Sequence, residues 1–425
     1  MRLNTMLTAG VCVAAALLAS APHVWADDQQ LLDKIKQLEQ RVSELEGKST
    51  QVVTQASISS ATLDFLNQVH LSGYVSGSYT YDFSRGTRGG VPSTIAGRLY
   101  DSNNNQFTPD KFKLVLEKPV DFSPTNWNAG FRVDLIAGKD AEVIHSTGLF
   151  GGQSFDLEQA YVKFNVPVGN GLTVLFGKHV TMLGVEVVEE VNNPNWSIGN
   201  QFMFVENTTQ TGIQLAYKWN DKIDTELCVI NGWDQVTDVN ASKTFMARVG
   251  VTFDANTSLS LLGYGGCEQP GDNHDYRTGA EVVFNRNKLF TDKLNAWVQL
   301  DYGHEDNAPL ADGSGITTKN GEWYAAGLWL TYDLTDKVGL AFRSDYLRDK
   351  DGVRTPSSGT VPVTGPVTFT LAPKELISET LTLNLKPFTS LQVRPEIRYD
   401  RASANTAFNG KQDQVTAEVG VAYLF

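Results

Sequence analysis

The segment Val69–Phe83, VHLSGYVSGSYTYDF, alternates apolar and polar residues almost without interruption. Its odd positions include Val69, Leu71, Val75 and Phe83, whereas its even positions are mostly histidine, serine, threonine and aspartate. Successive side chains of a strand point to opposite faces, so a period of two predicts a β-strand with one apolar face. That face contacts either the core of a soluble protein or lipid, and the rest of the chain decides between the two.

The same alternation recurs to the end of the chain in about sixteen segments over residues 69–425. Each segment is close to the ~10 residues that a tilted membrane strand needs. Tight connections, such as VGNG at residues 168–171, alternate with long polar ones. The long connections are predicted at residues 84–107, 137–155, 184–208, 305–320 and 349–373. Short turns on one side and long loops on the other are typical of outer-membrane barrels.

The chain ends on an alternating stretch too, AEVGVAYLF at residues 417–425. A soluble β-sandwich also buries one face of each strand, but it does not explain the short-long rule or the aromatic last residue. We therefore predict an all-β fold, a transmembrane antiparallel β-barrel of about 16 strands, in which the last strand pairs with the first. Phe425 then faces lipid and resembles the terminal aromatic signal that outer-membrane assembly machinery reads.

The N-terminus has the features of a secretory signal. Arg2 precedes an apolar run at residues 6–20, and small or apolar residues stand at Val24 and Ala26. This pattern predicts a signal peptide over residues 1–26; a membrane anchor is the alternative, but the run is shorter than the ~20 residues of a span. We therefore expect export to the outer membrane of a Gram-negative bacterium.

Two cysteines remain after such cleavage, Cys228 and Cys267. The strand assignment places them on alternate strands with a third strand between them. Neighbouring strands lie roughly 4.8 Å apart, so the two Cα atoms are too distant for a disulfide. We expect two buried thiols.

A heptad pattern precedes the first strand. Its apolar seam consists of Leu31, Ile35, Leu38, Val42 and Leu45. The seam predicts a periplasmic coiled-coil helix over residues 27–47, followed by a polar linker over residues 48–68. Fewer than three heptads are too short to be stable alone, so we expect neighbouring barrels to bring copies of the helix together. An amphipathic helix packed on its own barrel is the alternative.

The formal net charge of −13 excludes a nucleic-acid partner, which needs a basic face. The sequence contains no HExxH, G-x-S-x-G, CxxC or P-loop motif, so we predict no enzyme, no catalytic residues and no cofactor. Two oxygen-rich stretches, residues 100–110 and 304–313, could hold a divalent cation among outer-leaflet lipids. Neither has EF-hand spacing, and no metal site is predicted.

The polar positions of the strands have the parity that faces the barrel interior. The predicted lumen-lining charges are Lys111, Lys113, Arg132, Asp134, Glu158, Arg248, Arg277, Glu281 and Asp301. Charges of both signs inside a sixteen-stranded barrel predict a water-filled channel. A plugged barrel in which these charges pair with one another is the alternative.

The connection at residues 184–208 mixes apolar and aromatic residues with Glu186, Glu189 and Glu190. So many apolar groups favour a loop folded inward against the wall; an outward surface cap is the alternative. The loop follows the fifth strand, so the thirteenth lies diametrically opposite. That strand and the fifteenth carry Arg343, Arg394 and Arg398. An acidic loop facing a basic wall predicts a pore constriction with a transverse field.

Residues 177–217 resemble the OmpL-like β-barrel porin family, catalogued as putative β-barrel porin-2. The matching features are Gly177-Lys178, Gly184-Val185-Glu186, Asn192-Asn193-Pro194-Asn195-Trp196-Ser197, Phe204 and Thr211-Gly212. The sequence departs from the family pattern at Val185, where an aromatic is usual, and at Ile198, where an arginine often follows the serine.

The resemblance implies passive uptake of small hydrophilic solutes across an outer membrane, with lipid and lipopolysaccharide as surroundings and sometimes with trimeric assembly. We therefore expect a porin constricted by its third long loop, and a homo-oligomer in which a trimer is favoured. Two other functions stay open: a surface adhesin with a plugged lumen, and an outer-membrane hydrolase.

Overall fold

The computed structural model describes residues 33–44, 60–84, 94–311, 316–355 and 374–425. The chain forms two compact units, Met1–Asn67 and Gln68–Phe425. The first unit contains a helix over residues 33–44 and the short helix α3 (Ser60–Leu66). Within the described ranges, no helix is both long and apolar enough to span a bilayer.

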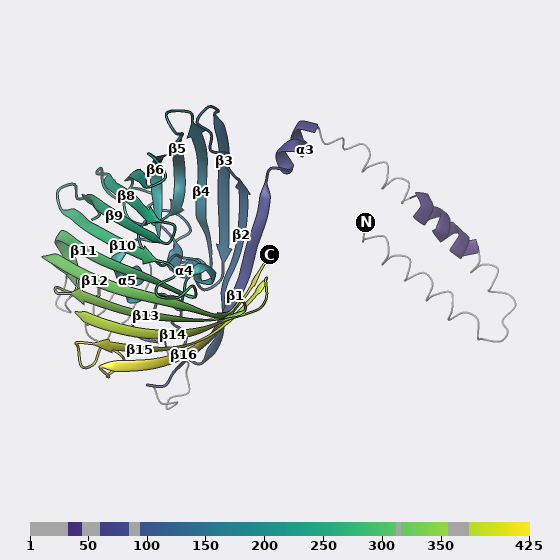
Figure 1. The fold of residues 1–425 in the computed structure, drawn as a ribbon. Coiled ribbons are helices and arrows are strands. Elements are labelled where there is room, and N and C mark those ends of the chain that lie inside the picture. Colours follow the sequence, from purple (N-terminus) through teal and green to yellow (C-terminus); the bar gives the residue numbers. More distant parts are fainter. Residues whose placement is uncertain (1–32, 45–59, 85–93, 312–315, 356–373) are drawn as a thin grey trace, which may run out of the picture. The chain divides into compact units, whose positions relative to one another are not determined.

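The second unit is a closed antiparallel barrel in which each strand pairs with its sequence neighbours (Figure 1). Its strands are β1 (His70–Asp82), β2 (Gln106–Lys118), β3 (Asn128–Ala137), β4 (Phe155–Val166), β5 (Leu172–Val180), β6 (Thr209–Lys218), β7 (Ile223–Ile230), β8 (Thr244–Asp254), β9 (Thr257–Cys267), β10 (Tyr276–Arg286), β11 (Leu294–Ala311), β12 (Ile316–Thr335), β13 (Val338–Asp349), β14 (Glu375–Phe388), β15 (Leu391–Ala402) and β16 (Asp413–Leu424). Strands β1 and β16 close the ring. The predicted sixteen-stranded barrel is confirmed.

The apolar positions of the strands lie on the outer surface. In β1, Leu71 and Val75 are exposed while Ser76 and Ser78 are buried. A barrel in water would have the reverse arrangement, so the outer surface is built for lipid. Phe425 extends this surface beyond β16: its backbone N–H donates to the carbonyl of Gly73 at 2.9 Å, and that of Gly73 donates back at 3.0 Å.

One predicted long connection was wrong. Residues 305–311 and 316–320 stay in the sheet, because β11 and β12 form a long hairpin whose pairing runs on to Ala311 opposite Ile316. The polar residues near position 306 mark a shift of register between Glu305 and Ala308. A strand that continues beyond the lipid region loses its apolar face, so periodicity alone placed its end too early.

Other predictions outside the barrel wall have mixed outcomes. Cys228 and Cys267 are both buried and free, as predicted. The helix at residues 33–44 lies inside the segment predicted to form a coiled coil, whereas α3 lies in the predicted linker. The predicted signal peptide, Leu31 and Leu45 lie outside the described residues.

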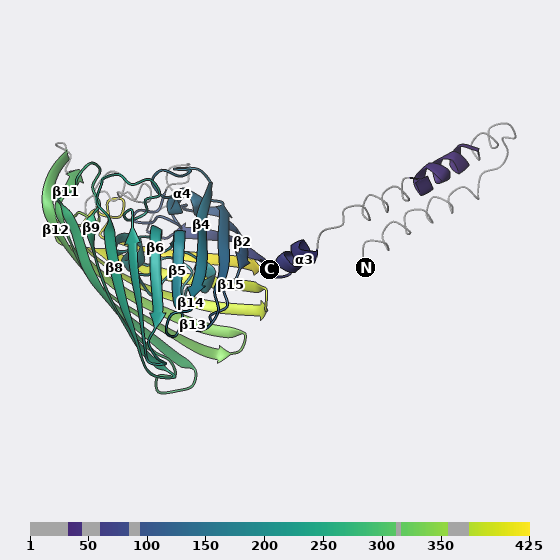
Figure 2. The same cartoon turned by 90° about the horizontal axis from the view of Figure 1, so that it is seen from above.

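The barrel interior contains an apolar cluster at the end where the long loops lie. It joins Ala96, Leu99 and Tyr100 of the first long connection with α4 (Ala141–Ile144) of the second and α5 (Asn200–Val205) of the third. Figure 1 shows α4 and α5 within the ring of strands, and Figure 2 shows the same wall turned by a right angle. The long loops therefore pack on one another inside the barrel.

Candidate functional site: the third loop in the lumen

The third loop, residues 181–208, joins β5 to β6 and contains the 3₁₀ turn η1 (Glu190–Asn192) and α5. Asn195, Phe204 and Asn207 are fully buried, and Trp196 nearly so. The loop contacts inner-face side chains of strands β10 to β16 as well as those of β1 and β2. Its position in the lumen is therefore determined by the wall all around it.

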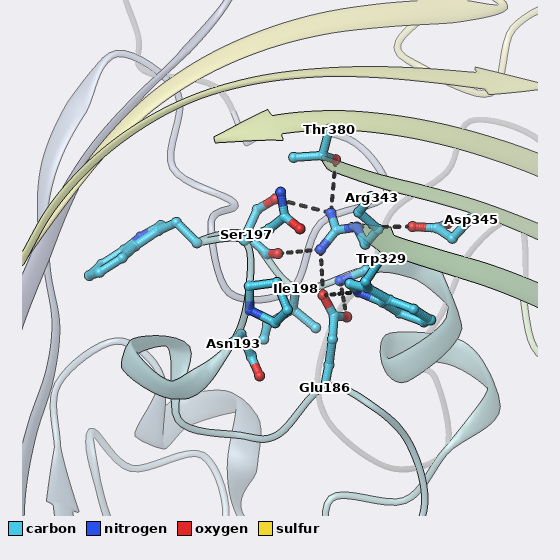
Figure 3. A network of polar contacts seen from close by, with 12 residues as sticks. Glu186, Asn193, Ser197, Ile198, Trp329, Arg343, Asp345 and Thr380 are labelled. Carbon is cyan, nitrogen blue, oxygen red and sulfur yellow. Dashed lines mark hydrogen bonds and ion pairs between the residues drawn. The ribbon is translucent and has the colours of Figure 1, made fainter. Parts of the chain in front are cut away.

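Arg343 of β13 connects the loop to the wall opposite β5 (Figure 3). Its Nη1 donates to Glu186 Oε1 at 2.6 Å and to the carbonyl of Ser197 at 2.5 Å. Its Nη2 donates to Thr380 Oγ1 at 3.0 Å, and its Nε lies 3.2 Å from Asp345. One guanidinium thus holds two turns of the loop, a geometry that its fixed fork of donors favours.

Two further arginines, both on β15, bind the backbone of the loop rather than its carboxylates. Arg394 donates to the carbonyl oxygens of Glu190, Asn193 and Pro194 at 2.7, 2.7 and 2.6 Å. Arg398 donates to the carbonyl of Ile198 at 2.7 Å and to Asn200 Oδ1 at 2.9 Å. The loop between η1 and α5 is irregular, so its carbonyl groups need such donors when buried.

The other two loop glutamates pair with lysines of β2. Lys111 Nζ lies 2.8 Å from Glu190 Oε2, which also accepts from the hydroxyl of Tyr74 at 3.0 Å. Burial by itself would raise the pKa of Glu190, but Lys111 outweighs it, so the pKa is lowered. Glu190 is therefore ionised and fixed.

Lys113 occupies the centre of three buried carboxylates. The ligand oxygens of Asp134, Glu158 and Glu189 all lie within 4.8 Å of one another, a spacing that suits a metal ion. Lys113 Nζ forms ion pairs with all three, at 2.9 Å to Asp134. The side-chain ammonium therefore takes the place that a cation would otherwise fill.

A second carboxylate group lies on the side of β10 and β11. Gln299 Nε2 donates to Glu206 at 2.7 Å and to Glu281 and Asp301 at 3.1 Å. The N–H of Gly184 in the loop donates to Glu281 at 2.8 Å. Burial, with Glu281 and Asp301 adding to it, raises the pKa of Glu206 well above its usual range. Glu206 therefore holds its proton more tightly than an ordinary carboxyl group does.

The structure brings the six predicted constriction residues together, but in pairings that the sequence did not predict. Of the three loop glutamates, only Glu186 pairs with an arginine through its carboxylate, that of Arg343. Glu189 and Glu190 pair with lysines instead. The uncharged partners Gln299 and Tyr74 were not predicted at all; their inward parity was the one signal available.

The nine predicted lumen-lining residues all lie on the inner face, in two environments. Arg132 and Arg248 are half-buried and pair with Asp134 and Glu226 at 2.8 and 2.7 Å. Arg277 is buried against Glu305 at 2.8 Å. The remaining buried members are Lys111, Lys113, Asp134, Glu158, Glu281 and Asp301.

Open space in the lumen adjoins the loop on the short-turn side. A recess of about 390 Å³ lies between the loop and strands β11 to β15. Trp297, Asp333, Lys337 and Arg394 are among its lining residues. It is large enough for a small polar solute and is bounded by charged and amide groups.

A closed sixteen-stranded barrel with an apolar outer face, a charged inner face and a long loop inside defines a channel-type outer-membrane barrel. Residues 68–425 match the family described as "Putative beta-barrel porin-2, OmpL-like". The chain belongs to this family.

Solved structures with the same fold are outer-membrane channels. The outer membrane channel DcaP of Acinetobacter baumannii is 14% identical, with a TM-score of 0.53 over 84% of this chain and 97% of that one. The anion-selective porin from Comamonas acidovorans is 10% identical, with a TM-score of 0.55 over 84% and 99%. OprB of Pseudomonas putida is 12% identical, with a TM-score of 0.55 over 86% and 96%. At such identity the likeness is one of fold. No curated protein matches the chain.

Proposed function

We propose that the protein is an outer-membrane porin, a channel without enzymatic activity that lets small hydrophilic solutes diffuse passively and is constricted by its third loop. The observation that carries the proposal is the loop itself. It crosses the lumen: Gly184 binds Glu281 of β10, while Glu190 and Glu189 pair with Lys111 and Lys113 of β2 on the opposite side of the ring. A loop fixed in this way narrows the passage through the barrel while the barrel wall stays intact.

The remaining polar wall supports a water-filled passage. Four charged side chains of strands β2, β3, β7 and β8 face inward and are partly exposed, by 20 to 37%: Glu117, Arg132, Glu226 and Arg248. Alternating charges of both signs on such a wall keep water in the passage and admit polar solutes. Lipid and lipopolysaccharide are the expected surroundings, with the short turns and both termini on the periplasmic side.

One observation favours a second function, a surface barrel with a closed lumen. The apolar cluster at the long-loop end includes α4, α5 and Phe408, and so packs three long connections together. An adhesin would use this arrangement to present rigid loops rather than to conduct.

Single-channel recording in a planar bilayer distinguishes the porin from the surface barrel with a closed lumen. The porin should give discrete, voltage-independent conductance steps in simple salts. Folded protein, shown by a gel mobility that changes on boiling, should be used throughout. Silence of that folded protein at all voltages and salt concentrations would contradict the porin and favour the closed barrel.

Charge selectivity tests the constriction. The triple replacement Glu186→Gln, Glu189→Gln and Glu190→Gln removes three negative charges, so that Arg343, Lys113 and Lys111 each lose one of their partners. A more positive confined neck attracts anions, so the permeability ratio should shift toward anions. Reversal potentials in a salt gradient measure it.

The control for that variant is Asp221→Asn with Asp292→Asn, which removes charge from exposed turns. It should leave the reversal potential unchanged. An unchanged potential in the triple variant itself would mean that solutes do not pass the third loop.

A further inference from the structure

A group of sulfur and imidazole side chains lies on the inner wall, where β5, β7 and β8 approach the start of the third loop. Cys228 and Met246 are each 2% exposed, and His179 is 4% exposed. The chain has only five methionines. Two of them are here, because Met246 belongs to the apolar cluster around Cys228 and Met182 packs against it. A thiol, two thioethers and an imidazole therefore gather at one place in the wall.

The imidazole of His179 presents a free nitrogen to the thiol. Its Nδ1 donates to the carbonyl of Val180 at 2.9 Å, since a carbonyl oxygen can only accept. Nε2 of the neutral ring therefore carries a lone pair, and it lies 3.9 Å from Sγ of Cys228. A hydrogen bond from the other ring nitrogen to a carbonyl is how proteins fix the ring of a metal-binding histidine.

The distance between Nε2 of His179 and Sγ of Cys228 suits a metal ion bound to both atoms. With bonds of about 2.0 Å to nitrogen and about 2.3 Å to sulfur, the two bonds would enclose an angle of about 130°. This angle is wider than the ~109° of a tetrahedral site and fits an ion with two or three ligands. Monovalent copper accepts such low coordination numbers, whereas structural zinc takes four ligands.

Met246 is placed to act as a third ligand. It is the cross-strand partner of Cys228 in the β7–β8 ladder, and side chains in such pairs have Cβ atoms about 4.5–5.5 Å apart. The Cys228 thiol donates to Gln210 Oε1 at 3.6 Å, and Gln210 Nε2 donates to Met246 Sδ at 3.1 Å. Both sulfur atoms therefore contact one amide group. The flexible methionine side chain can turn its sulfur toward an ion at the thiol.

The charge of the surroundings favours a monovalent ion. Ile230 and Leu262 are among the apolar residues packed around Cys228. Glu226, two positions before Cys228 on the same face, is already paired with Arg248 at 2.7 Å. A thiolate and a monovalent ion cancel each other's charge. A divalent ion would leave a net positive charge, which burial among apolar groups disfavours.

We propose that Cys228, His179 and Met246 bind a soft monovalent metal ion of the copper(I) type. Thiolate and thioether ligands favour such ions over the hard cations that carboxylates bind. On binding, the thiol releases its proton to the solvent, and the thiolate sulfur and the imidazole Nε2 form bonds to the metal. The site joins β5, β7 and β8 beside the first residues of the third loop, whether or not the barrel conducts.

Copper(I) itself tests the site. The full chain is refolded in detergent with Cu⁺ present, under reducing and oxygen-free conditions, so that the ion can enter a buried position. The chelator bathocuproine disulfonate then competes for the ion and removes it from any isolated thiol. We expect one Cu⁺ per folded barrel to be retained, with a thiolate-to-copper absorption band in the ultraviolet. An excess of Zn²⁺ should leave this ion in place.

Matched variants locate the ion. Cys228→Ser should lose it, whereas Cys267→Ser should keep it, although both thiols are buried. His179→Asn should weaken retention about tenfold or more. Met246→Leu should weaken it by a smaller factor, and Met203→Leu, at a buried methionine of another cluster, should have no effect. A gel mobility that changes on boiling shows that each variant is folded.

Three outcomes overturn the proposal. The first is that folded wild-type protein retains no Cu⁺ against the chelator, which would leave Cys228 with a packing role alone. The second is retention by folded Cys228→Ser, or an equal loss in Cys267→Ser, either of which would place the ion elsewhere. The third is displacement of Cu⁺ by Zn²⁺, which would contradict a soft monovalent site.

Discussion

At the scale of single residues, the interior of this barrel contains many buried ion pairs. Removing one partner of such a pair is expected to cost more stability than removing both. Arg343 is fully buried and pairs with Glu186 and Asp345. Desolvation costs both charges heavily, and their attraction compensates for this only while the partner stays in place.

Replacing Arg343 alone therefore tests the anchor of the third loop. Arg343→Met should lower the free energy of unfolding by roughly 3–5 kcal/mol, because it leaves Glu186 and Asp345 buried without their cation. The double variant Arg343→Met with Glu186→Met should recover the part of that loss that comes from Glu186, while Asp345 stays without its arginine. Urea unfolding of the folded barrel in detergent measures both, and equal stability of the wild type and Arg343→Met would argue against the anchor.

Glu206 gives a dependence on pH. Burial, then Glu281 and Asp301, raise its pKa well above the usual range in the folded state. The folded chain thus keeps a proton that the unfolded chain releases above about pH 4.3. The stability linked to this proton is complete below that pH and is lost as the pH rises through the folded-state value.

Glu206→Gln should remove this dependence, because the amide cannot ionise. We expect the wild type to lose more stability than the variant between about pH 5 and about pH 9. Denaturation midpoints at the two pH values measure the difference. Parallel losses in both proteins would assign the pH effect to other groups.

At the scale of elements, periodicity predicted the strands because lipid on one face and water or polar groups on the other impose a strict period of two. It failed at residues 305–320, where β11 and β12 pair on beyond the apolar zone. The third loop was predicted to fold inward from its apolar content, and its contacts lie in the lumen. Its partners were not predictable, since neighbours Glu189 and Glu190 bind different lysines of β2.

The segment after β13 offers a test at this scale. The carboxylate of Asp349 accepts hydrogen bonds from the backbone N–H groups of Gly352, Val353, Arg354 and Thr355. Arg354 Nε then donates to the carbonyl of Phe204 in α5 at 2.6 Å. The connection that follows β13 is thereby linked to the third loop.

Asp349→Ala should release this tie, because four backbone donors lose one shared acceptor. We expect a loss of about 1–3 kcal/mol in unfolding free energy and a larger or noisier single-channel conductance. Lys350→Ala, at an exposed neighbouring position, is the control and should behave as wild type. A single-channel conductance of Asp349→Ala that equals that of the wild type in size and noise would show that this segment does not affect the passage.

At the scale of the whole molecule, the N-terminal unit carries an apolar face with no partner among the described residues. Ile35, Leu38 and Val42 of the helix at residues 33–44 are all exposed. Three such residues on one helix face favour packing against another copy when barrels hold copies close together. We therefore expect this unit to support a homo-oligomer, with a trimer favoured.

Deleting residues 27–60 tests that role. The barrel wall begins at His70, so conductance per channel should stay close to wild type while the oligomer dissociates at a lower detergent concentration or temperature. Light scattering of the purified protein measures the oligomer. The double substitution Leu38→Glu with Val42→Glu should act like the deletion. An oligomer equally resistant in all three proteins would show that the barrels associate without the helix.

Because Lys113 supplies the positive charge among Asp134, Glu158 and Glu189, this group does not depend on the ionic composition of the medium. A metal ion bound from the medium dissociates when the medium is diluted or when a chelator competes for it. The ammonium of a lysine is covalently part of the chain and cannot dissociate from it. This part of the channel should therefore keep its form in soft water and in brine alike.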